Sequence, residues 1–397
     1  MAGYVTRKGK KYYAVVEIER DPLTGKRRRT WHPAGATKRG AQQVLGQLLE
    51  DLETNSYLEP EAITVAEYLT DEWLVSAMNE LRFATYDSYR RNIENHVVPH
   101  IGAAKLQALR PIDLSRYYSM LLTSGRRDGR GGLSTKSVRN IHQTLRKAFD
   151  DAVGLHYLRT NPAVGAKPPR VTTGSDSIRY WTATELRTFL WESHGHRHIP
   201  LWTLAASTGM RRGEVLGLRW RDVDLKAQRL SVRQTIISVG YEVIRSDPKT
   251  AKGARTIDLD GRTVRMLRAH RADQRLERQL LALPDDGEGL VFCRENGEPY
   301  HPDLVRQSFE RRVSASAVPR IRFHDLRHTH ATLMLQAGVP PKVVSERLGH
   351  STVAFTMDVY AHVIPGMQAD AAETFGQLVF GGTDADPVDV GGEGEEH

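Results

Sequence analysis

The spacing of apolar residues near the N-terminus predicts a small sheet with one helix packed on it. Three short segments are predicted as strands, at residues 3–7, 11–19 and 26–32. The second is rich in aromatic and β-branched residues, and the third is basic and ends near Trp31. Thr37 is a candidate N-cap for a helix that ends near Glu53, because apolar residues recur at helical spacing between them. We therefore predict that residues 1–55 form a three-stranded sheet backed by one helix.

The next part of the chain has the pattern of helices only. Between residues 63 and 165 apolar residues follow the i, i+3, i+4 spacing of amphipathic helices. Thr64 and Glu67 have the spacing of a capping box at the start of the first helix. The segments on either side, 54–62 and about 161–177, have the polar, Pro- and Gly-containing composition of linkers. This pattern predicts an all-helical domain over residues 63–165.

Residues 178–380 mix the two periodicities. Alternating apolar residues predict strands at 230–239, 241–244 and 255–259. Apolar stripes predict helices at 201–208, 262–283, 302–314, 324–337, 340–348 and 352–360. Residues 381–397 are rich in Gly and acidic residues, which predicts a disordered acidic tail. The predicted fold is multidomain α+β, with the small N-terminal sheet and helix, an all-helical domain, and a mixed, mainly α-helical domain that contains a small antiparallel sheet.

Composition places the chain among globular proteins. Its 397 residues predict two or three domains, and a hydrophobic fraction of 40% is enough to build their cores. No apolar run approaches the roughly 20 residues that a membrane span needs, and the N-terminus lacks the apolar core of a signal peptide. We therefore expect a soluble, intracellular protein. The single cysteine, Cys293, excludes an internal disulfide and a zinc site built from several cysteines, and its apolar neighbours favour a buried structural thiol.

The positive charge is concentrated near the N-terminus. The formal net charge is +8, and residues 1–40 carry eleven Lys and Arg residues against three acidic ones, so this segment contains the whole excess. A concentrated basic module indicates a polyanionic partner such as nucleic acid, whereas the alternative is a solvated basic face. The charge pattern alone does not decide between them.

A set of polar residues in the last predicted domain has the chemistry needed to cleave a phosphodiester. In chain order its members are Arg211, Lys249, His324, Arg327, His350 and Tyr360. The planar guanidinium group donates two hydrogen bonds to a pair of phosphate oxygens and keeps its charge. A tyrosine hydroxyl can attack phosphorus when cations hold the phosphate and an acid protonates the leaving oxygen. His324 and Arg327 are three residues apart, so one face of a helix presents both.

In order and spacing these residues resemble the signature of the tyrosine recombinases, and specifically of the phage-type integrases. That signature is an arginine in a T-G-x-R-x-x-E segment, a lysine in a β-hairpin, an H-x-x-R helix, a His or Trp after Leu-Gly, and a tyrosine, here ten residues after His350. The resemblance covers roughly residues 178–380 and, more weakly, the upstream part. It implies a site-specific DNA recombinase that cuts and rejoins strands through a 3′-phosphotyrosyl intermediate. Such an enzyme needs no metal, ATP or other cofactor, and it integrates or excises a mobile element such as a phage.

The resemblance gives the cationic residues of the set a common task. Arg211 and Arg327 would clamp the phosphate oxygens, and His350 would donate a third hydrogen bond. Glu214, three residues after Arg211, is expected to orient that arginine as a buried partner rather than to act as a general base.

The remaining residues of the set would move protons. Tyr360 is the implied nucleophile, and its phenol must lose a proton, since its ordinary pKa of about 10 leaves it protonated at pH 7. His324 is our candidate to take that proton, with His350 as the alternative. Lys249 is implied as the acid that protonates the leaving 5′ oxygen, although Lys252 lies three residues further on.

The upstream modules resemble the DNA-binding domains of phage-type integrases. Residues 1–55 resemble the arm-type DNA-binding domain, and its candidate DNA contacts are Arg27, Arg28 and Arg29. Residues 63–165 resemble the helical core-binding (SAM-like) domain, and its candidates are Lys136, Arg139 and Arg146. The implied partners are double-stranded DNA attachment sites, further copies of the chain in a homotetramer, and an accessory DNA-bending or directionality protein, with no membrane partner. The implied location is the bacterial cytoplasm, in association with the nucleoid.

Several alternatives stay open at this point. A non-catalytic DNA-binding regulator, a type IB topoisomerase and a hydrolytic nuclease are the rival functions. His324 and His328 have the i, i+4 spacing of a zinc-binding helix, but the resemblance explains His324 without a metal. Three alternating histidines, His194, His196 and His198, are more typical of a chance cluster than of a metal site. An apolar stripe after Tyr360, formed by Met367, Ala371, Phe375 and Leu378, packs either in cis or on a neighbouring protomer, as it does in that family.

Overall fold

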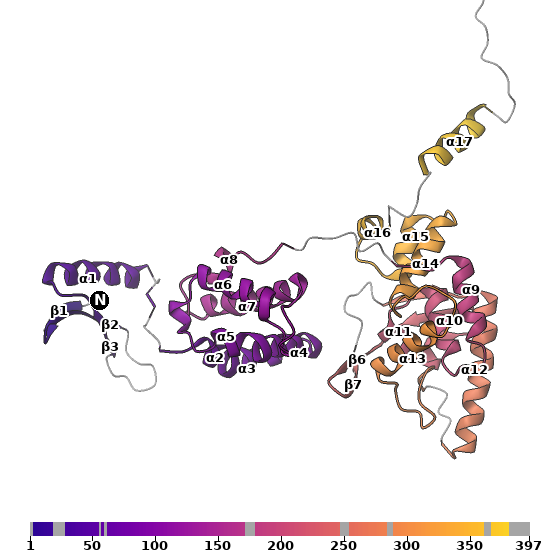
Figure 1. The fold of residues 1–397 in the computed structure, drawn as a ribbon, viewed down its shortest axis with the longest axis horizontal. Coiled ribbons are helices and arrows are strands. Elements are labelled where there is room, and N and C mark those ends of the chain that lie inside the picture. Colours follow the sequence, from indigo (N-terminus) through magenta and orange to yellow (C-terminus); the bar gives the residue numbers. More distant parts are fainter. Residues whose placement is uncertain are drawn as a thin grey trace, which may run out of the picture. The chain divides into compact units, whose positions relative to one another are not determined.

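The computed structural model of the chain describes residues 3–18, 28–54, 57–58, 62–170, 179–246, 254–283, 289–360 and 367–380. The chain divides into two compact units, Met1–Gly174 and Ser175–His397 (Figure 1). The first unit contains the N-terminal sheet and a set of helices, and the second mixes helices with small antiparallel sheets. The predicted fold class is therefore confirmed. The predicted acidic tail, 381–397, lies outside the described residues.

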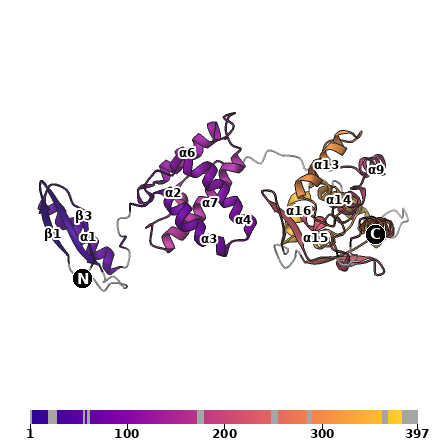
Figure 2. The same cartoon turned by 90° about the horizontal axis from the view of Figure 1, so that it is seen from below.

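A three-stranded antiparallel sheet with one helix begins the first unit. The strands β1 (Gly3–Lys8), β2 (Lys11–Ile18) and β3 (Arg28–Pro33) lie in that order, and α1 (Lys38–Glu53) packs on them. The predicted cap is confirmed, because Oγ1 of Thr37 accepts a hydrogen bond from the Gly40 amide at 3.2 Å. The helix α1 lies along the sheet (Figures 1 and 2). Ala14 on β2 and Ala41 on α1 are buried in the core of this part of the chain, where their small side chains allow close packing.

The rest of the first unit is helical, as the sequence pattern predicts. Its elements are α2 (Val65–Glu67), η1 (Tyr68–Trp73), α3 (Leu74–Glu80), α4 (Phe83–Asn92), η2 (Ile93–Val97), α5 (Val98–Ile101), η3 (Leu106–Ala108), α6 (Pro111–Ser124), α7 (Thr135–Gly154) and α8 (Pro162–Gly165). The capping box of Thr64 and Glu67 forms, with both reciprocal hydrogen bonds present. Tyr68, Leu114 and Phe149 are among the fully buried side chains of this core. A π-helical turn, η1, interrupts the first helix, which the apolar spacing does not reveal.

The second unit combines helices with two small sheets. Its helices are α9 (Ala183–Glu192), α10 (Ile199–Thr208), α11 (Arg212–Leu216), η4 (Trp220–Asp222), α12 (Gly261–Leu280), α13 (Pro302–Ser314), α14 (Asp325–Gln336), α15 (Pro341–Leu348), α16 (Val353–Tyr360) and α17 (Met367–Phe380). Its strands are β4 (Val223–Asp224), β5 (Arg229–Val232), β6 (Thr235–Val239), β7 (Glu242–Ser246) and β8 (Arg255–Asp258). β4, β5 and β8 form one antiparallel sheet, and β6 and β7 form a separate hairpin.

The single strand predicted at 230–239 is wrong, because the structure divides it into β5 and β6. Leu230 and Val232 are buried on β5, which pairs with β8, whereas Ile236 is buried on β6, which pairs with β7. The buried residues on both sides of the break are at even-numbered positions. A period of two therefore continues in the sequence although the pairing partner changes.

The core of the second unit is built around α10, which is apolar on almost every side. Trp202 on α10 is fully buried, and Phe189 and Phe309 pack against its ring with centroids 5.4 and 5.9 Å away. The helices α14, α15 and α16 lie together in Figure 2. A smaller apolar cluster joins them, and it includes Leu348 and Tyr360. These packed helices provide the frame for the candidate site. Among the described residues, no helix has the length and apolar character required to cross a membrane.

Candidate active site

Arg211 is held by a tight turn between two helices. Gly209 ends α10 with a left-handed backbone, φ +65°, which a residue with a side chain adopts at a cost. Arg211 then forms the N-cap of α11. Its amide donates to Oε2 of Glu214 at 2.9 Å, and its Nη1 donates to Oε1 of the same carboxylate at 2.8 Å. The side chain is still 44% exposed, so the guanidinium group is oriented by Glu214 and remains accessible.

Glu214 is shared by two arginines. Nη2 of Arg255, on β8, donates to Oε2 of Glu214 at 2.9 Å, and both side chains are buried. Burial alone would raise the pKa of Glu214, but the hydrogen bond and charge of Arg255, and then those of Arg211, outweigh it and hold the pKa below its ordinary value. Glu214 is therefore a carboxylate that orients Arg211. Sequence reasoning did not find Arg255, since no motif marks it.

Arg327 is a buried cation with no ion pair to any described residue. It lies on α14 with 4% exposure, and its Nη1 donates to the carbonyl oxygen of Gly209 at 2.8 Å. Within the described part of the chain its Nη2 has no hydrogen-bond partner, and no carboxylate lies within ion-pair distance. Burial, followed by the charge of Arg211, lowers the pKa of Arg327 to about 9, so the group is charged at pH 7. A buried cation of this kind favours an anion next to it.

His350 follows a second left-handed turn. Gly349, with φ +68°, ends α15, and its carbonyl oxygen lies 3.4 Å from Nη2 of Arg211. Nδ1 of His350 is 2.7 Å from the hydroxyl of Thr356, which is fully buried on α16. Burial, followed by the charges of Arg327 and Arg211, lowers the pKa of His350 to about 3. The imidazole is therefore neutral at pH 7. When its Nδ1 accepts from Thr356, its Nε2 carries the hydrogen that it can donate.

Tyr360 lies at the end of α16 with its phenol turned into the unit. The side chain is only 1% exposed, and burial raises its pKa to about 12, although the charge of Arg327 acts in the opposite direction. Its Oη is 2.8 Å from Nδ1 of His328 on α14. His324, which we expected to take the phenol proton, has no hydrogen bond to Tyr360 within the described residues. Its ring meets the ring of His328 edge to face, 5.3 Å away.

The structure thus gathers the predicted catalytic residues from two helices, α14 and α16, and from two turns of one unit. It brings together Arg211, His324, Arg327, His350 and Tyr360, while the predicted Lys249 lies outside the described residues. It adds His328 and Thr356, which sequence reasoning did not assign to the site. His328 was visible in the sequence as the residue four after His324, one helical turn away, but that spacing was interpreted only as a possible metal motif.

The predicted DNA contacts of the helical region form one exposed stripe. Lys136, Arg139 and Arg146 are exposed on α7 at helical spacing, and within the described residues none of them has an acidic partner. Other basic residues of the helical region are paired with carboxylates. Arg90 pairs with Asp87 and Glu94, Arg91 pairs with Asp87, and Lys147 pairs with Asp151.

The basic strand of the N-terminal sheet is described only in part. Arg27 lies outside the described residues, and Arg28 occupies the β3 position opposite Ile18. Arg29 is exposed and donates to the carboxylate of Glu17 at 2.9 Å. The stripe on α7 is therefore the more clearly described basic surface.

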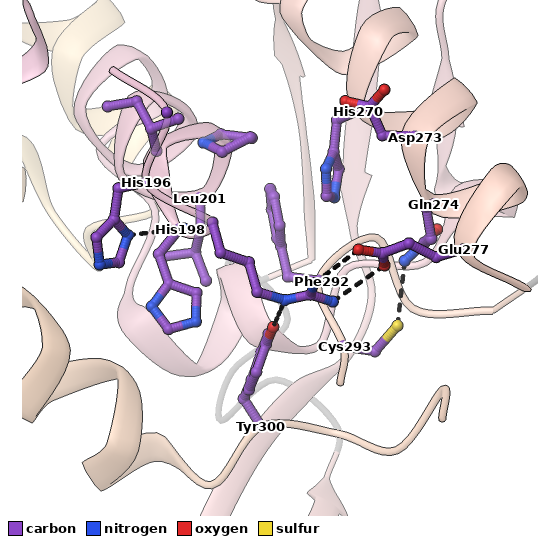
Figure 3. Close-up of a pocket in the computed structure, with 14 residues that line it drawn as sticks. His196, His198, Leu201, His270, Asp273, Gln274, Glu277, Phe292, Cys293 and Tyr300 are labelled. Atoms are coloured by element: carbon purple, nitrogen blue, oxygen red, sulfur yellow. Dashed lines mark hydrogen bonds and ion pairs between the residues drawn. The ribbon is translucent and has the colours of Figure 1, made fainter. Parts of the chain in front are cut away.

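A second histidine-rich pocket lies apart from these residues. His196, His198, His270, Cys293 and Tyr300 line it (Figure 3). His196 stacks on Trp202, and Arg197 is held by Glu277 at 2.7 Å and by the Tyr300 hydroxyl at 2.9 Å. Cys293 is buried, as predicted, and burial raises the pKa of its thiol. Among the residues that the structure describes, no group of three His, Cys, Asp or Glu side chains is arranged to hold a metal ion.

Comparison with known proteins gives this arrangement a family. The profile of the phage integrase family matches residues 182–366, and that of the phage integrase N-terminal SAM-like domain matches residues 65–122. The chain is 31% identical to a tyrosine recombinase XerC-like protein of Caldanaerobacter subterraneus subsp. tengcongensis, over 94% of this chain and 97% of the relative. It is 25% identical to the ICEBs1 integrase of Bacillus subtilis, over 93% and 97% of the two chains.

Solved structures show the same fold. The Tn1549 transposon integrase in complex with transposon right end DNA is 21% identical with a TM-score of 0.63, over 80% of this chain and all of that one. A lambda integrase tetramer bound to a Holliday junction is 19% identical with a TM-score of 0.53, over 90% of this chain and 94% of the other. The fold and site define a tyrosine recombinase. The chain belongs to the phage integrase family of these enzymes.

Proposed function

We propose that this protein is a site-specific integrase that cuts and rejoins double-stranded DNA with Tyr360 as its nucleophile. One observation carries the proposal. Among the described residues, the buried guanidinium group of Arg327 has a nitrogen without a hydrogen-bond partner, beside the exposed Arg211 and the phenol of Tyr360. Cations that still have hydrogen bonds to donate stabilise the negative charge that develops on the phosphate oxygens in the transition state. The family membership supports the same chemistry.

The proposed reaction proceeds in two transfers of one phosphodiester. Oη of Tyr360 attacks phosphorus, the phenol proton passes to a histidine, and the bond from phosphorus to the 5′ oxygen breaks. Lys249 gives the leaving oxygen a proton, and a 3′-phosphotyrosyl bond remains. Arg211, Arg327 and the Nε2 hydrogen of His350 hold the non-bridging oxygens. In the second transfer the 5′ hydroxyl of another strand attacks the phosphotyrosine, and the protons return. The number of phosphodiester bonds is conserved, so ATP is not consumed.

The other parts of the chain are proposed to position DNA. Residues 1–55 would bind arm-type sites, residues 63–165 would bind the core site through the stripe on α7, and residues 178–380 would carry the catalysis. The relatives are integrases and recombinases, which supports integration or excision of a mobile element such as a phage. Strand exchange between two duplexes requires four active sites, so we propose a homotetramer on DNA. An accessory DNA-bending or directionality protein and a place at the bacterial nucleoid complete this proposal.

The test uses DNA that flanks the chain's own gene, where an integrase's site often lies. The full-length protein is incubated with this DNA in EDTA, stopped with SDS, and examined for a covalent adduct. We expect an adduct from the wild type and none from Tyr360→Phe, with DNA binding retained by both. An adduct that persists in Tyr360→Phe would contradict the assignment of the nucleophile. Relaxation of a supercoiled plasmid that lacks the flanking DNA would favour a topoisomerase instead.

A further inference from the structure

His328 makes a direct contact with the nucleophile. It lies four residues after His324 on α14, and its ring centroid is 5.7 Å from that of Tyr360 on α16. The 2.8 Å between Nδ1 and Oη is a hydrogen-bond distance. When the ring is neutral with its hydrogen on Nε2, the phenol donates and Nδ1 accepts. The lone pair of Nδ1 is then already aligned with the proton that Tyr360 must lose.

The surroundings keep the imidazole of His328 in its neutral form. Burial, followed by the charge of His324, lowers its pKa to about 4, and Arg327 and Arg322 act in the same direction. Asp325 acts in the opposite direction, but its carboxylate is engaged by Arg322 at 2.8 Å. From the other elements, Tyr360 on α16 faces the ring, and His350, also neutral at pH 7, lies close enough to interact with it. At pH 7 His328 is therefore able to accept a proton.

A bound phosphodiester would make His328 a better proton acceptor. Its negative charge offsets Arg211 and Arg327, so that the protonated form of His328 costs less. Burial raises the pKa of Tyr360 to about 12 although Arg327 acts in the opposite direction, so the phenol keeps its proton in the free protein. The phenol becomes acidic enough to lose its proton to His328 as Oη bonds to phosphorus.

We propose that His328 is the general base of the reaction, a role that rests on the function proposed above. As the bond between Oη and phosphorus forms and the bond from phosphorus to the 5′ oxygen breaks, the phenol proton moves to Nδ1 of His328. The imidazolium keeps this proton while the phosphotyrosyl bond exists. When the incoming 5′ hydroxyl restores the phosphodiester, the proton returns to the departing Tyr360 oxygen. This assignment leaves His324, at the N-terminal end of α14, free to contact the phosphate.

Replacement of His328 by asparagine keeps an acceptor for the hydrogen bond of the phenol but removes the group that takes its proton. The asparagine Oδ1 can accept a hydrogen bond near the position of Nδ1, but it does not bind a proton at pH 7. With the full-length protein and DNA flanking its gene, we expect His328→Asn to form the adduct at least about 100-fold more slowly, the lower range for loss of a general base. The matched control is His194→Asn at an exposed histidine, which should keep the wild-type rate.

Two further measurements distinguish a catalytic role of His328 from a structural one. DNA binding by His328→Asn should stay within about twofold of the wild type, and free imidazole should restore part of the adduct formation of His328→Ala. A rate for His328→Asn equal to that of the wild type would overturn the proposal, because holding the phenol would then be sufficient. Failure of the wild type on flanking DNA that it binds would count against the proposed function itself.

A measurement without DNA tests the contact independently of activity. In the full-length chain with ¹⁵N-labelled histidine, the ring resonances of His328 are those missing from His328→Asn. We expect Tyr360→Phe to shift them, because phenylalanine has no hydroxyl to donate. Unchanged resonances would show that Nδ1 does not accept from Tyr360 and would overturn the assignment of His328, whatever the outcome on DNA.

Discussion

At the scale of single residues, the site combines arginines whose hydrogen-bonding groups are not all used with histidines that are kept neutral. Arg327 is buried with one nitrogen unpartnered among the described residues, and Arg211 is oriented by Glu214 while half exposed. Burial, followed by neighbouring charged groups that include Arg327, depresses the pKa values of His328 and His350. The site therefore combines arginines that can hold an anion with neutral histidines that can accept or donate a proton.

Thr356 tests whether the orientation of His350 matters. Thr356→Val removes the hydroxyl that meets Nδ1 at 2.7 Å, in a site where Thr356 is fully buried. We expect the free energy of unfolding to fall by about 1–3 kcal/mol, the cost of a buried polar group without its partner. Adduct formation should fall roughly tenfold, because the Nε2 hydrogen is no longer directed at the phosphate, a loss of about 1.4 kcal/mol. Thr356→Ser keeps the hydroxyl and should recover most of both; equal loss in the two variants would contradict this role.

Glu214 makes a pH-dependent contribution to stability. Because its pKa is lowered by folding, its stabilisation is present above the unfolded pKa of about 4.3 and is lost as the pH falls through the folded pKa. Glu214→Gln should lower the free energy of unfolding by about 3 kcal/mol at pH 7, since Arg255 loses its buried partner.

Urea titrations of both proteins at decreasing pH measure this effect. The difference in the free energy of unfolding between wild type and Glu214→Gln should narrow below about pH 4, where the wild-type carboxylate takes up its proton. Glu277→Gln is the matched control, because its pair with Arg197 is 38% exposed and should be worth less than about 1 kcal/mol. A gap that stays constant as the pH falls would contradict the ionised state of Glu214.

At the scale of elements, two left-handed glycines position residues of the candidate site. Gly209 ends α10 and Gly349 ends α15, and the residues that follow them, Arg211 and His350, belong to the site. Arg255 on β8 joins these turns, because it bonds Glu214 on α11 and also donates to the carbonyl oxygen of Arg347 on α15 at 2.7 Å. The helices are thereby fixed at their ends, close to the site.

The turn at Gly209 has no room for a side chain. A Cβ at this position would lie 2.5 Å from Cδ2 of Leu348 and 2.8 Å from the ring of His330. Gly209→Ala should therefore lower the free energy of unfolding by more than about 2 kcal/mol, through backbone strain and overpacking together. Gly195→Ala is the control, with φ +80° and no atom within 4 Å, and should cost only about 1 kcal/mol of strain. Equal thermal shifts of the two variants would show that the close contact with α14 and α15 is unimportant.

At the scale of the whole molecule, the predicted DNA-binding stripe and the proposed catalytic residues lie on separate parts of the chain. The proposed catalytic residues that the structure describes all belong to the second unit, whereas the stripe on α7, which has no acidic partner among the described residues, belongs to the first. Productive cleavage would then require one DNA molecule to contact both units. Phe375 and Leu378 on α17 are 63% and 80% exposed, which is consistent with the alternative in which this helix meets another protomer.

Salt dependence of DNA binding tests the stripe on α7. Each lost phosphate contact lowers the slope of log affinity against log salt by about 0.9. The variant that combines alanine at Lys136, Arg139 and Arg146 should therefore lower the slope by about 2–3. The matched triple alanine variant at Arg90, Arg91 and Lys147 removes equal charge from residues that already pair with carboxylates. It should change the slope much less, and equal slopes would refute the stripe as the DNA contact.

The local signals in the sequence predicted most elements near the site. The capping box of Thr64, the end of the helix 201–208 and the helix 302–314 all form as predicted. The predicted strand 230–239 was wrong because an uninterrupted period of two does not report a change of partner strand. The same limit applies to the site, since a motif indicates which residue types occur in order but not which atoms meet.

By itself the sequence predicted the fold class and the candidate residues Arg211, His324, Arg327, His350 and Tyr360, because periodicity, capping and motif spacing follow from the order of residues along the chain. Tertiary structure alone decided that His328 rather than His324 meets the phenol, that Arg255 shares Glu214 with Arg211, and that Thr356 holds His350. The physical reason is that these contacts join residues on different elements, and a contact between elements depends on how the helices pack.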